Sequence, residues 1–272
     1  MKNVMSVGKE FLKPVYRSGK HLFLNLSQVY YGIFRNNKFE CNVCHFKTNK
    51  FNSNTWHLYC NCPNCNSDIR HRLLIASLEL LDDVGFSRIF DGKKILHFAP
   101  EKEFGDLIKK RADKYFTADF LAEGYSYKNI DYNIDISDMK MIGDASFDCV
   151  IACDVLEHVP DHKKGILEVY RILKKGGYCI FTVPQKDNLK VTFEDASITD
   201  KEEREKIFGQ WDHLRIYGSD FVDIMQDCGF KVTAVDQSYF DKKDIEYYVL
   251  APPVISSHPL ATNFRKIFFG LK

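Results

Sequence analysis

The sequence lacks the long apolar segments of membrane and exported proteins. No apolar run in the 272 residues approaches the ~20 needed to span a bilayer. The opening segment, MKNVMSVGKEFLKPVYRSGKHLFLNL, has lysines but neither a long apolar core nor a small-residue cleavage site, unlike a secretory signal peptide. We therefore expect a cytoplasmic protein without a transmembrane segment.

The chain also lacks an excess of charge of either sign. It has 38 basic and 37 acidic residues, a formal net charge of +1. A protein held to RNA or DNA mainly by phosphate contacts usually shows a clear basic excess. A small-molecule or saccharide substrate is therefore expected in preference to nucleic acid, although a local basic patch remains compatible with these totals.

Cysteines, by contrast, are clustered. Two CxxC pairs, CNVC and CPNC, are separated by seventeen residues. In a reducing compartment this spacing indicates a zinc ribbon rather than disulfides. Four thiolates fill a tetrahedral zinc site and leave no position for water, so the metal should be structural. The predicted ligands are Cys41, Cys44, Cys62 and Cys65.

The spacing leaves some alternatives for the ribbon open. Iron in place of zinc is compatible with the same four thiolates. Cys60, two residues before the second pair, is interpreted as a bystander, with ligand exchange as the alternative. His45 and His57 are weaker substitute ligands.

The remainder of the chain alternates between strand and helix patterns. Short apolar runs predict strands at 95–98, 115–118, 132–134, 149–152 and 178–183. Helical periodicity is found at 69–81, 101–111 and 164–174, and Gly176-Gly177 should stop the last of these helices. Such alternation predicts an α/β fold with a parallel sheet covered on both faces.

The C-terminal region breaks this alternation. A helix is predicted at 220–228 and strands at 231–235 and 246–250. Residues 237–244 are too few for a crossover helix, so the last strand should pair antiparallel with its predecessor. This ending differs from an all-parallel dinucleotide-binding fold.

The predicted organisation has three parts. Residues 1–40 form a helical extension, with a membrane-surface helix as the alternative; residues 41–72 form the ribbon; and residues 73–272 form the main domain. At the boundary, Arg70, His71 and Arg72 either anchor the ribbon through carboxylates or line the entrance for an anionic substrate.

The turn after the first strand of the main domain lacks the GxGxxG motif of dinucleotide sites. It reads ILHFAPEKEF, with Glu101 where a phosphate would otherwise bind. A carboxylate there suits S-adenosylmethionine, which carries an ammonium and a sulfonium but no phosphate. The alternative is a glutamate that only caps the following helix.

Two further acids follow the next two strands. Asp119 is placed to accept hydrogen bonds from a ribose diol, and Asp135 from an adenine amino group, with Ile136 against the ring. Each acid taken alone is equally compatible with a surface loop.

The segment FDCVIACDVLEHVPDHKKGILEVYRILKKGGYCIFTVP, at 147–184, resembles class I S-adenosylmethionine-dependent methyltransferases of type 11. The similarity extends more loosely over 95–250. LHFAPE replaces the usual acid and glycine-rich turn, and a CPxCxSxxRHR-like ribbon is similar to a zinc-ribbon subgroup. The resemblance implies a seven-stranded Rossmann-like sheet, parallel except for one antiparallel C-terminal strand. It also implies a cofactor site comprising Phe98, Ala99, Glu101, Asp119, Asp135, Ile136 and Cys153.

Residues 185–217 form a long connection, predicted to be a substrate loop. Its FGQWDHLRIYG segment resembles one in the same subgroup. His213 is a candidate general base, and Arg215, with Tyr217 beside it, a candidate substrate contact. The alternative is that these side chains and Trp211 only hold the loop in place. His158 is a second candidate base, with a structural role as its alternative.

These patterns together favour a methyltransferase (EC 2.1.1.-) acting on an oxygen or nitrogen of a small molecule or saccharide. An RNA base methyltransferase and a catalytically silent binding module with the same fold are the alternatives.

Overall fold

The computed structural model describes residues 37–120 and 130–272. The predicted helical extension over residues 1–40 therefore falls almost entirely outside the described residues. None of the helices in the described ranges has the length and apolar character needed to cross a bilayer.

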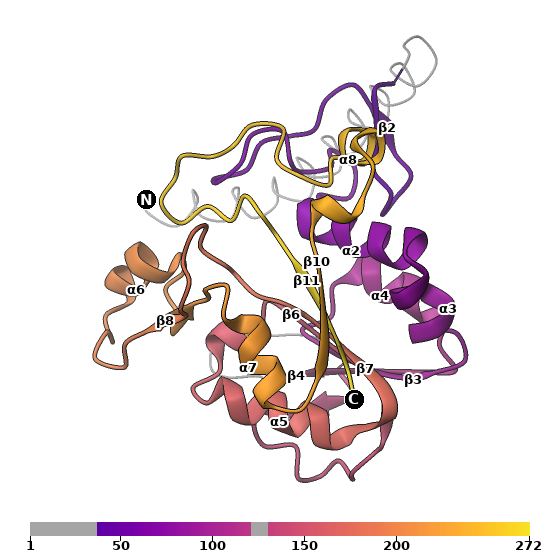
Figure 1. Cartoon of the computed structure of the whole chain (residues 1–272), viewed down its shortest axis with the longest axis vertical. Coiled ribbons are helices and arrows are strands. Elements are labelled where there is room, and N and C mark those ends of the chain that lie inside the picture. The colour runs from indigo at the N-terminus through magenta and orange to yellow at the C-terminus, as the bar shows by residue number, and fades with distance from the viewer. Residues whose placement is uncertain (1–36, 121–129) are drawn as a thin grey trace, which may run out of the picture.

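A single mixed sheet organises the main domain (Figure 1). Its strand order is β10-β11-β7-β6-β3-β4-β5. All neighbouring strands are parallel except for the two pairs that β11 forms, with β10 and with β7, and the predicted fold class is confirmed. The strands are β3 (Lys94–Phe98), β4 (Lys114–Asp119), β5 (Tyr132–Asn133), β6 (Phe147–Cys153), β7 (Leu173–Thr182), β10 (Lys231–Val235) and β11 (Ile267–Leu271).

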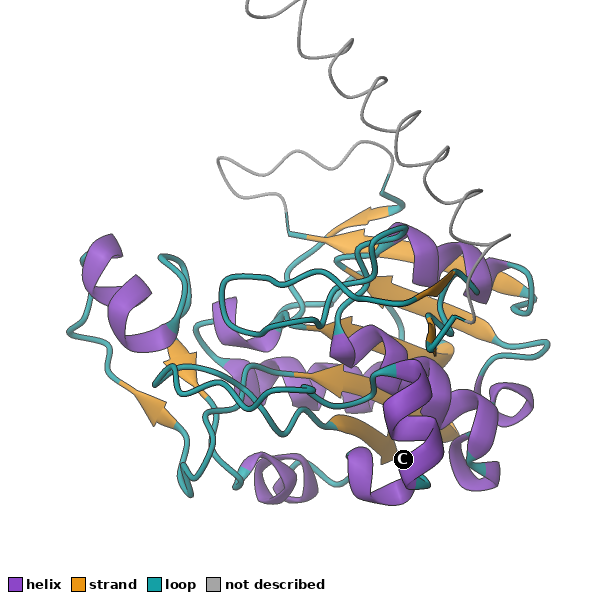
Figure 2. Ribbon diagram, turned by 90° about the horizontal axis from the view of Figure 1, so that it is seen from above, coloured by secondary structure: helices purple, strands orange, loops and turns teal. Residues whose placement is uncertain are grey.

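Helices cover both faces of this sheet (Figure 2). Successive side chains of a strand point to opposite faces, so the central strand β6 contributes to two cores. Val150 and Ala152 of β6 pack against the helices on one face, which form the first set, and Cys149 and Ile151 pack against those on the other face, which form the second. The first set is α5 (His162–Ile172) and α7 (Phe221–Asp227), and the second is α2 (Ile69–Leu80), α3 (Phe86–Ile89) and α4 (Lys102–Lys109). Short 3-10 turns are η1 (Asp82–Val84), η2 (Leu156–His158) and η3 (Gln237–Tyr239).

The predicted strand at 246–250 is wrong. The chain forms helix α8 (Lys242–Tyr248) there, and the antiparallel strand is β11, some twenty residues later. The IFFGL sequence of β11 is almost fully buried between β7 and β10, whereas Leu250 is buried at the end of a helix. A short apolar run does not distinguish these two situations, because burial alone does not fix the backbone conformation.

The predicted helix stop at Gly176-Gly177 is also wrong. Helix α5 ends at Ile172, and both glycines lie within β7. The pairing of β6 and β7 shifts register between Phe147 and Cys149, at a β-bulge. A Cβ on Gly177 would lie 2.9 Å from the carbonyl oxygen of Asp148, so the irregular pairing needs a glycine here.

The cysteine-rich region lies beside α8, at the top of Figure 1. Its strands β1 (Phe39–Glu40) and β2 (Lys47–Thr48) pair antiparallel. The Tyr247 hydroxyl donates to Glu40 over 2.9 Å. Arg72 is fully buried and donates to backbone carbonyls of Cys60, Ser67, Tyr248 and Val249. Arg72 therefore joins the ribbon to the main domain without a carboxylate.

The connection at 185–217 has secondary structure of its own. A two-stranded sheet, β8 (Phe193–Glu194) with β9 (Arg215–Ile216), closes its base, and helix α6 (Lys201–Phe208) lies between them. Figure 1 shows α6 and β8 at the side of the molecule, away from α3 and α4. Phe208 and Ile216 form a small separate core with Ile198.

Candidate functional site

The parallel strands end at one edge of the sheet, and the predicted cofactor residues meet there. In the pairing register, Phe98 at the end of β3 lies between Ala118 of β4 and Ala152 of β6. Asp119 and Cys153 are therefore the next residues on either side. This edge is where open α/β sheets bind ligands.

The backbone at this edge adopts an unusual conformation at two adjacent strand ends. Ala99, directly after β3, has φ 46°, and Asp154, directly after β6, has φ 50°. Side chains disfavour the left-handed region, and such residues concentrate at functional sites. The turn thus keeps, at an alanine, a conformation that glycine usually supplies.

Asp119 and Asp135 are held only by local donors within the described residues. The Asp119 carboxylate accepts from the N–H of Phe120 over 2.8 Å, and burial raises its pKa. Asp135 accepts from the N–H and hydroxyl of Ser137 over 2.7 and 2.8 Å. Ile136 is 3% exposed beside them. Neither acid is paired with a basic side chain in the described ion pairs, so both retain acceptor capacity for a ligand.

Glu101 is in a different state, because two basic side chains bind it. Arg70 donates to both carboxylate oxygens, and the Nε2 of His71 lies 2.7 Å from one of them. Burial would raise the pKa of Glu101, but the His71 hydrogen bond and the Arg70 charge lower it to about 2. Burial and the Arg70 charge would lower the pKa of His71, but its hydrogen bonds to Asp68 and Glu101 raise it to about 9. The anchoring interpretation of this segment fits these contacts.

The ion-pair network continues to β6 and to the C-terminal segment. The Nε of Arg70 lies 3.1 Å from Asp154, and Arg265 donates to the same carboxylate over 2.8 Å. The Thr182 hydroxyl donates to Asp154 as well, over 2.8 Å. Although burial would raise the pKa of Asp154, Arg265 and Arg70 hold it below its usual range. We call Asp68, Arg70, His71, Glu101, Asp154 and Arg265 the clamp.

A cavity of ≈ 230 Å³ borders this clamp. The ribbon, the 185–217 connection and the C-terminal segment all contribute to its wall. Its lining includes Trp56, Arg70, Asp154, His213, Ile216 and Arg265. A second cavity, of ≈ 310 Å³, lies between the ribbon and α4 and is lined by His71 and Glu101.

The two candidate bases lie together. The rings of His158 and His213 are 4.8 Å apart at an angle of 79°. The Nδ1 of His158 is 3.3 Å from Asp212, and the Nδ1 of His213 is 3.0 Å from the carbonyl of Phe208. Burial and the neighbouring His158 lower the pKa of His213. His213 is therefore neutral at neutral pH.

Arg215 and Tyr217 are engaged inside the protein. The Arg215 guanidinium donates to the carbonyls of Leu156, Val159 and Pro160 and to Glu194. The hydroxyl of Tyr217 is 3.0 Å from His162 Nδ1. These contacts hold the connection against η2 and favour the loop-holding alternative. Trp211 is 42% exposed, with the Lys201 ammonium 4.6 Å from its ring.

The burial of Cys153 excludes it from nucleophilic chemistry. Desolvation raises the pKa of its thiol to about 12, so the reactive thiolate is absent at neutral pH. The sequence predicts Cys153 near the cofactor, but it predicts neither its neighbour Asp154 nor the distant Arg265 as part of this edge. The position of Asp154 directly after a strand could have indicated a functional residue, whereas nothing in the sequence around Arg265 does so.

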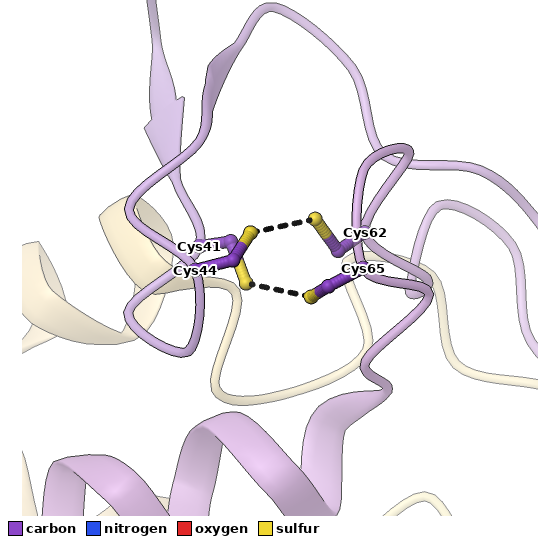
Figure 3. A group of neighbouring side chains, drawn as sticks. All are labelled: Cys41, Cys44, Cys62 and Cys65. Atoms are coloured by element: carbon purple, nitrogen blue, oxygen red, sulfur yellow. Dashed lines mark hydrogen bonds between the residues drawn. The ribbon is translucent and has the colours of Figure 1, made fainter. Parts of the chain in front are cut away.

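The four predicted metal ligands converge as Figure 3 shows. The sulfurs of Cys41 and Cys65 are 3.7 Å apart, as are those of Cys44 and Cys62. Zinc bonded to four sulfurs at ≈ 2.3 Å would separate them by about 3.8 Å. The cluster is therefore compatible with a tetrahedral metal ion. Cys60 lies outside this group and donates to the Leu58 carbonyl.

The methyltransferase domain family of type 11 matches residues 108–181. The predicted family resemblance is thus confirmed for this part of the chain. No curated protein sequence matches.

Solved structures include similar chains, although at low identity. An S-adenosylmethionine-dependent methyltransferase from Mesorhizobium loti is 12% identical, with 67% of this chain and 92% of that chain covered and a TM-score of 0.46. One from Archaeoglobus fulgidus is 16% identical, with 69% and 90% covered and a TM-score of 0.45. The 1,6-didemethyltoxoflavin-N1-methyltransferase of Burkholderia thailandensis, solved with its substrate and S-adenosylhomocysteine, is 10% identical, with 72% and 78% covered and a TM-score of 0.46.

Proposed function

We propose that the chain transfers a methyl group from S-adenosylmethionine to an oxygen or nitrogen of a small molecule or saccharide, as the methyltransferase-domain match over residues 108–181 suggests. The observation that carries this proposal is the arrangement of Asp119, Asp135 and Ile136 at the edge of the sheet, where both carboxylates keep acceptor capacity. These residue types suit a ribose diol, an adenine amino group and an adenine ring, respectively.

The cofactor would supply an electrophilic methyl group on a sulfonium. Asp119 would hold the ribose, Asp135 and Ile136 the adenine, and Phe98 and Ala99 the turn beside the methionine end. Glu101 already binds Arg70 and His71 in the structure, so we assign it to shaping this turn rather than to a free contact with the cofactor ammonium.

The acceptor would occupy the ≈ 230 Å³ cavity, which adjoins Asp154 at the end of β6. This volume lies below the 300–1,000 Å³ typical of drug-sized ligands, which favours a small acceptor group. Methyl transfer is an in-line displacement, so most of the rate enhancement comes from holding donor and acceptor in line. His213, which lines the cavity, and the adjacent His158 are proposed to assist loss of the acceptor proton.

We assign residues 41–72 to a structural zinc ribbon and residues 73–272 to the catalytic domain. Cys41, Cys44, Cys62 and Cys65 would hold the ion, with the 3.7 Å sulfur separations as the supporting observation. The ribbon would also form part of the acceptor cavity through Trp56. A metal-binding cluster of cysteine thiolates suits a reducing compartment, and we therefore propose a cytoplasmic location.

Calorimetric titration with S-adenosylhomocysteine tests the cofactor site. We expect micromolar binding by the wild type, a strong loss in Asp119→Ala, and no change in Asp138→Ala, which removes an exposed acid paired with Lys140. Absence of binding by folded, zinc-loaded wild type would contradict the enzyme assignment and favour a silent binding module.

A further inference from the structure

Three potential metal ligands lie close together, and one of them, His213, lines the ≈ 230 Å³ cavity. Glu157 and His158 belong to η2, just after β6, and His213 comes from the 185–217 connection. One ligand atom from each lies within 4.8 Å of the other two. The N–H of Leu214 donates to the carbonyl of Glu157 over 2.9 Å, which fixes the two segments relative to each other.

Glu157 has one carboxylate oxygen without a hydrogen-bond partner in the described part of the chain. Its side chain is 1% exposed, and its Oε2 accepts no hydrogen bond from the described residues. Its Oε1 is 3.9 Å from the Nε2 of His213, which is too long for a hydrogen bond. An ionised carboxylate buried at this position needs a compensating positive charge, and a bound cation would supply one.

The histidines show the outer contacts that metal-binding histidines have. A metal-ligating imidazole usually donates its other N–H to a carbonyl or carboxylate, and this bond fixes the tautomer and the ring. The Nδ1–H of His213 donates to the carbonyl of Phe208 over 3.0 Å. The Nε2 therefore keeps its lone pair, and it lies 3.9 Å from Oε1 of Glu157. His158 has a carboxylate neighbour, Asp212, at 3.3 Å from its Nδ1.

We propose that Glu157, His158 and His213 bind a divalent transition-metal ion, separate from the four-cysteine cluster. Two imidazoles and one carboxylate suit manganese, iron or zinc and leave coordination positions open. The cavity wall that His213 forms gives these positions access to a bound acceptor. Thiolates, by comparison, select softer metals, so the two sites differ in preference.

The role of this ion in catalysis rests on the proposed function, whereas its binding does not. An acceptor hydroxyl bound to the metal would have a lowered pKa and would release its proton to water, so that His158 and His213 would assist this proton loss as metal ligands rather than as general bases. The acceptor oxygen would then form a bond to the methyl carbon while the carbon–sulfur bond breaks. The electron pair of the broken carbon–sulfur bond would remain on sulfur. The acceptor class that this site favours is therefore a hydroxyl-bearing small molecule.

Manganese binding to the zinc-loaded full chain tests the proposal, because Mn²⁺ prefers oxygen and nitrogen ligands over thiolates. Paramagnetic resonance of free Mn²⁺ counts the bound ions. We expect one bound Mn²⁺ per wild-type chain, and at least a tenfold weaker affinity in Glu157→Gln and in His213→Gln. His258→Gln, at an exposed histidine, should bind like wild type. Thermal unfolding of each variant verifies that it is folded.

Two outcomes would overturn the proposal. One is no Mn²⁺ uptake by the wild type and no zinc beyond one ion per chain. The other is undiminished binding in folded Glu157→Gln, which would mean that Glu157 is simply protonated and that the ion lies elsewhere. S-adenosylhomocysteine binding in metal-free buffer, measured in parallel, tests the cofactor site independently.

Discussion

The two halves of the sheet edge treat their carboxylates in opposite ways. Along β4 and β5, Asp119 and Asp135 accept only from local backbone and serine donors. Along β3 and β6, Glu101 and Asp154 are bound by Arg70, His71 and Arg265, which come from α2 and from the C-terminal segment. The carboxylates of the first half can still accept hydrogen bonds from a ligand. Those of the second half already form ion pairs that hold distant segments of the chain together.

The clamp also holds the turn after β3, which lacks the glycine-rich motif. The clamp fixes Glu101, the residue after Ala99 and Pro100, from outside the turn. The cysteine-rich region is therefore connected to the turn after β3 through α2, which begins at Ile69, four residues after Cys65. Four predictions test this division of roles.

The largest effect is expected from removing a ribbon ligand. Cys62→Ala should lose the metal and unfold the ribbon, since metal binding supplies on the order of 10 kcal/mol to four-ligand sites near neutral pH. Metal analysis and thermal unfolding measure the change. Cys60→Ser, which retains a hydrogen-bond donor to Leu58, should keep one zinc per chain. Equal zinc content in both variants would contradict the assignment of the four cysteines as the zinc ligands.

The clamp should contribute more than a surface ion pair. Asp154→Asn leaves Arg70 and Arg265, with side chains 14% and 13% exposed, short of a counter-charge. We expect a loss of about 2–4 kcal/mol in unfolding free energy, measured with urea. Asp138→Asn, at an exposed pair, should lose less than about 1 kcal/mol. Similar losses in the two variants would mean that the clamp is not structural.

Asp119 should affect affinity and leave stability nearly unchanged. Asp119→Asn replaces charged acceptors for a ribose by a neutral amide, so S-adenosylhomocysteine should bind with about 1.5–3 kcal/mol less free energy, roughly ten- to hundredfold weaker. Urea unfolding should be close to that of wild type. A large loss of stability with unchanged affinity would reverse the roles of the two halves.

The smallest expected effect is a pH dependence of stability from the clamp. His71 has a folded-state pKa of about 9 against an ordinary 6.5, so its contribution is complete below pH 6.5 and is lost as pH rises toward 9. Glu101, at about 2 against 4.5, contributes above pH 4.5 and loses this contribution in acid. The melting temperature should fall more from pH 6.5 to 9 in wild type than in His71→Asn. Parallel curves would show that His71 is not charged in the clamp.

The sequence predicted those features of the structure that depend on residues close together in the chain. The cysteine spacing placed all four thiolates in one cluster, and the strand-end acids Asp119 and Asp135 followed from apolar runs of fixed length. Features set by tertiary packing were not predictable. Arg265 lies 111 positions from Asp154, and nothing in its sequence context indicates the pairing.

The antiparallel strand illustrates the same limit. Both 246–250 and Ile267–Leu271 are short apolar segments, and only the second fits the space between β7 and β10. Glu157, the buried acid of the proposed metal site, was hidden by its place in a familiar Leu-Glu-His turn. The structure shows its unpaired oxygen and the proximity of His213, which the sequence does not indicate.

A crystal structure of the protein with S-adenosylhomocysteine tests the central claim most directly. The account predicts ribose hydroxyls within hydrogen-bond distance of Asp119 and adenine against Ile136, with Arg70, Glu101 and Asp154 still paired. A nucleoside bound instead in the cavity between Trp56, Arg265 and His213 would contradict it.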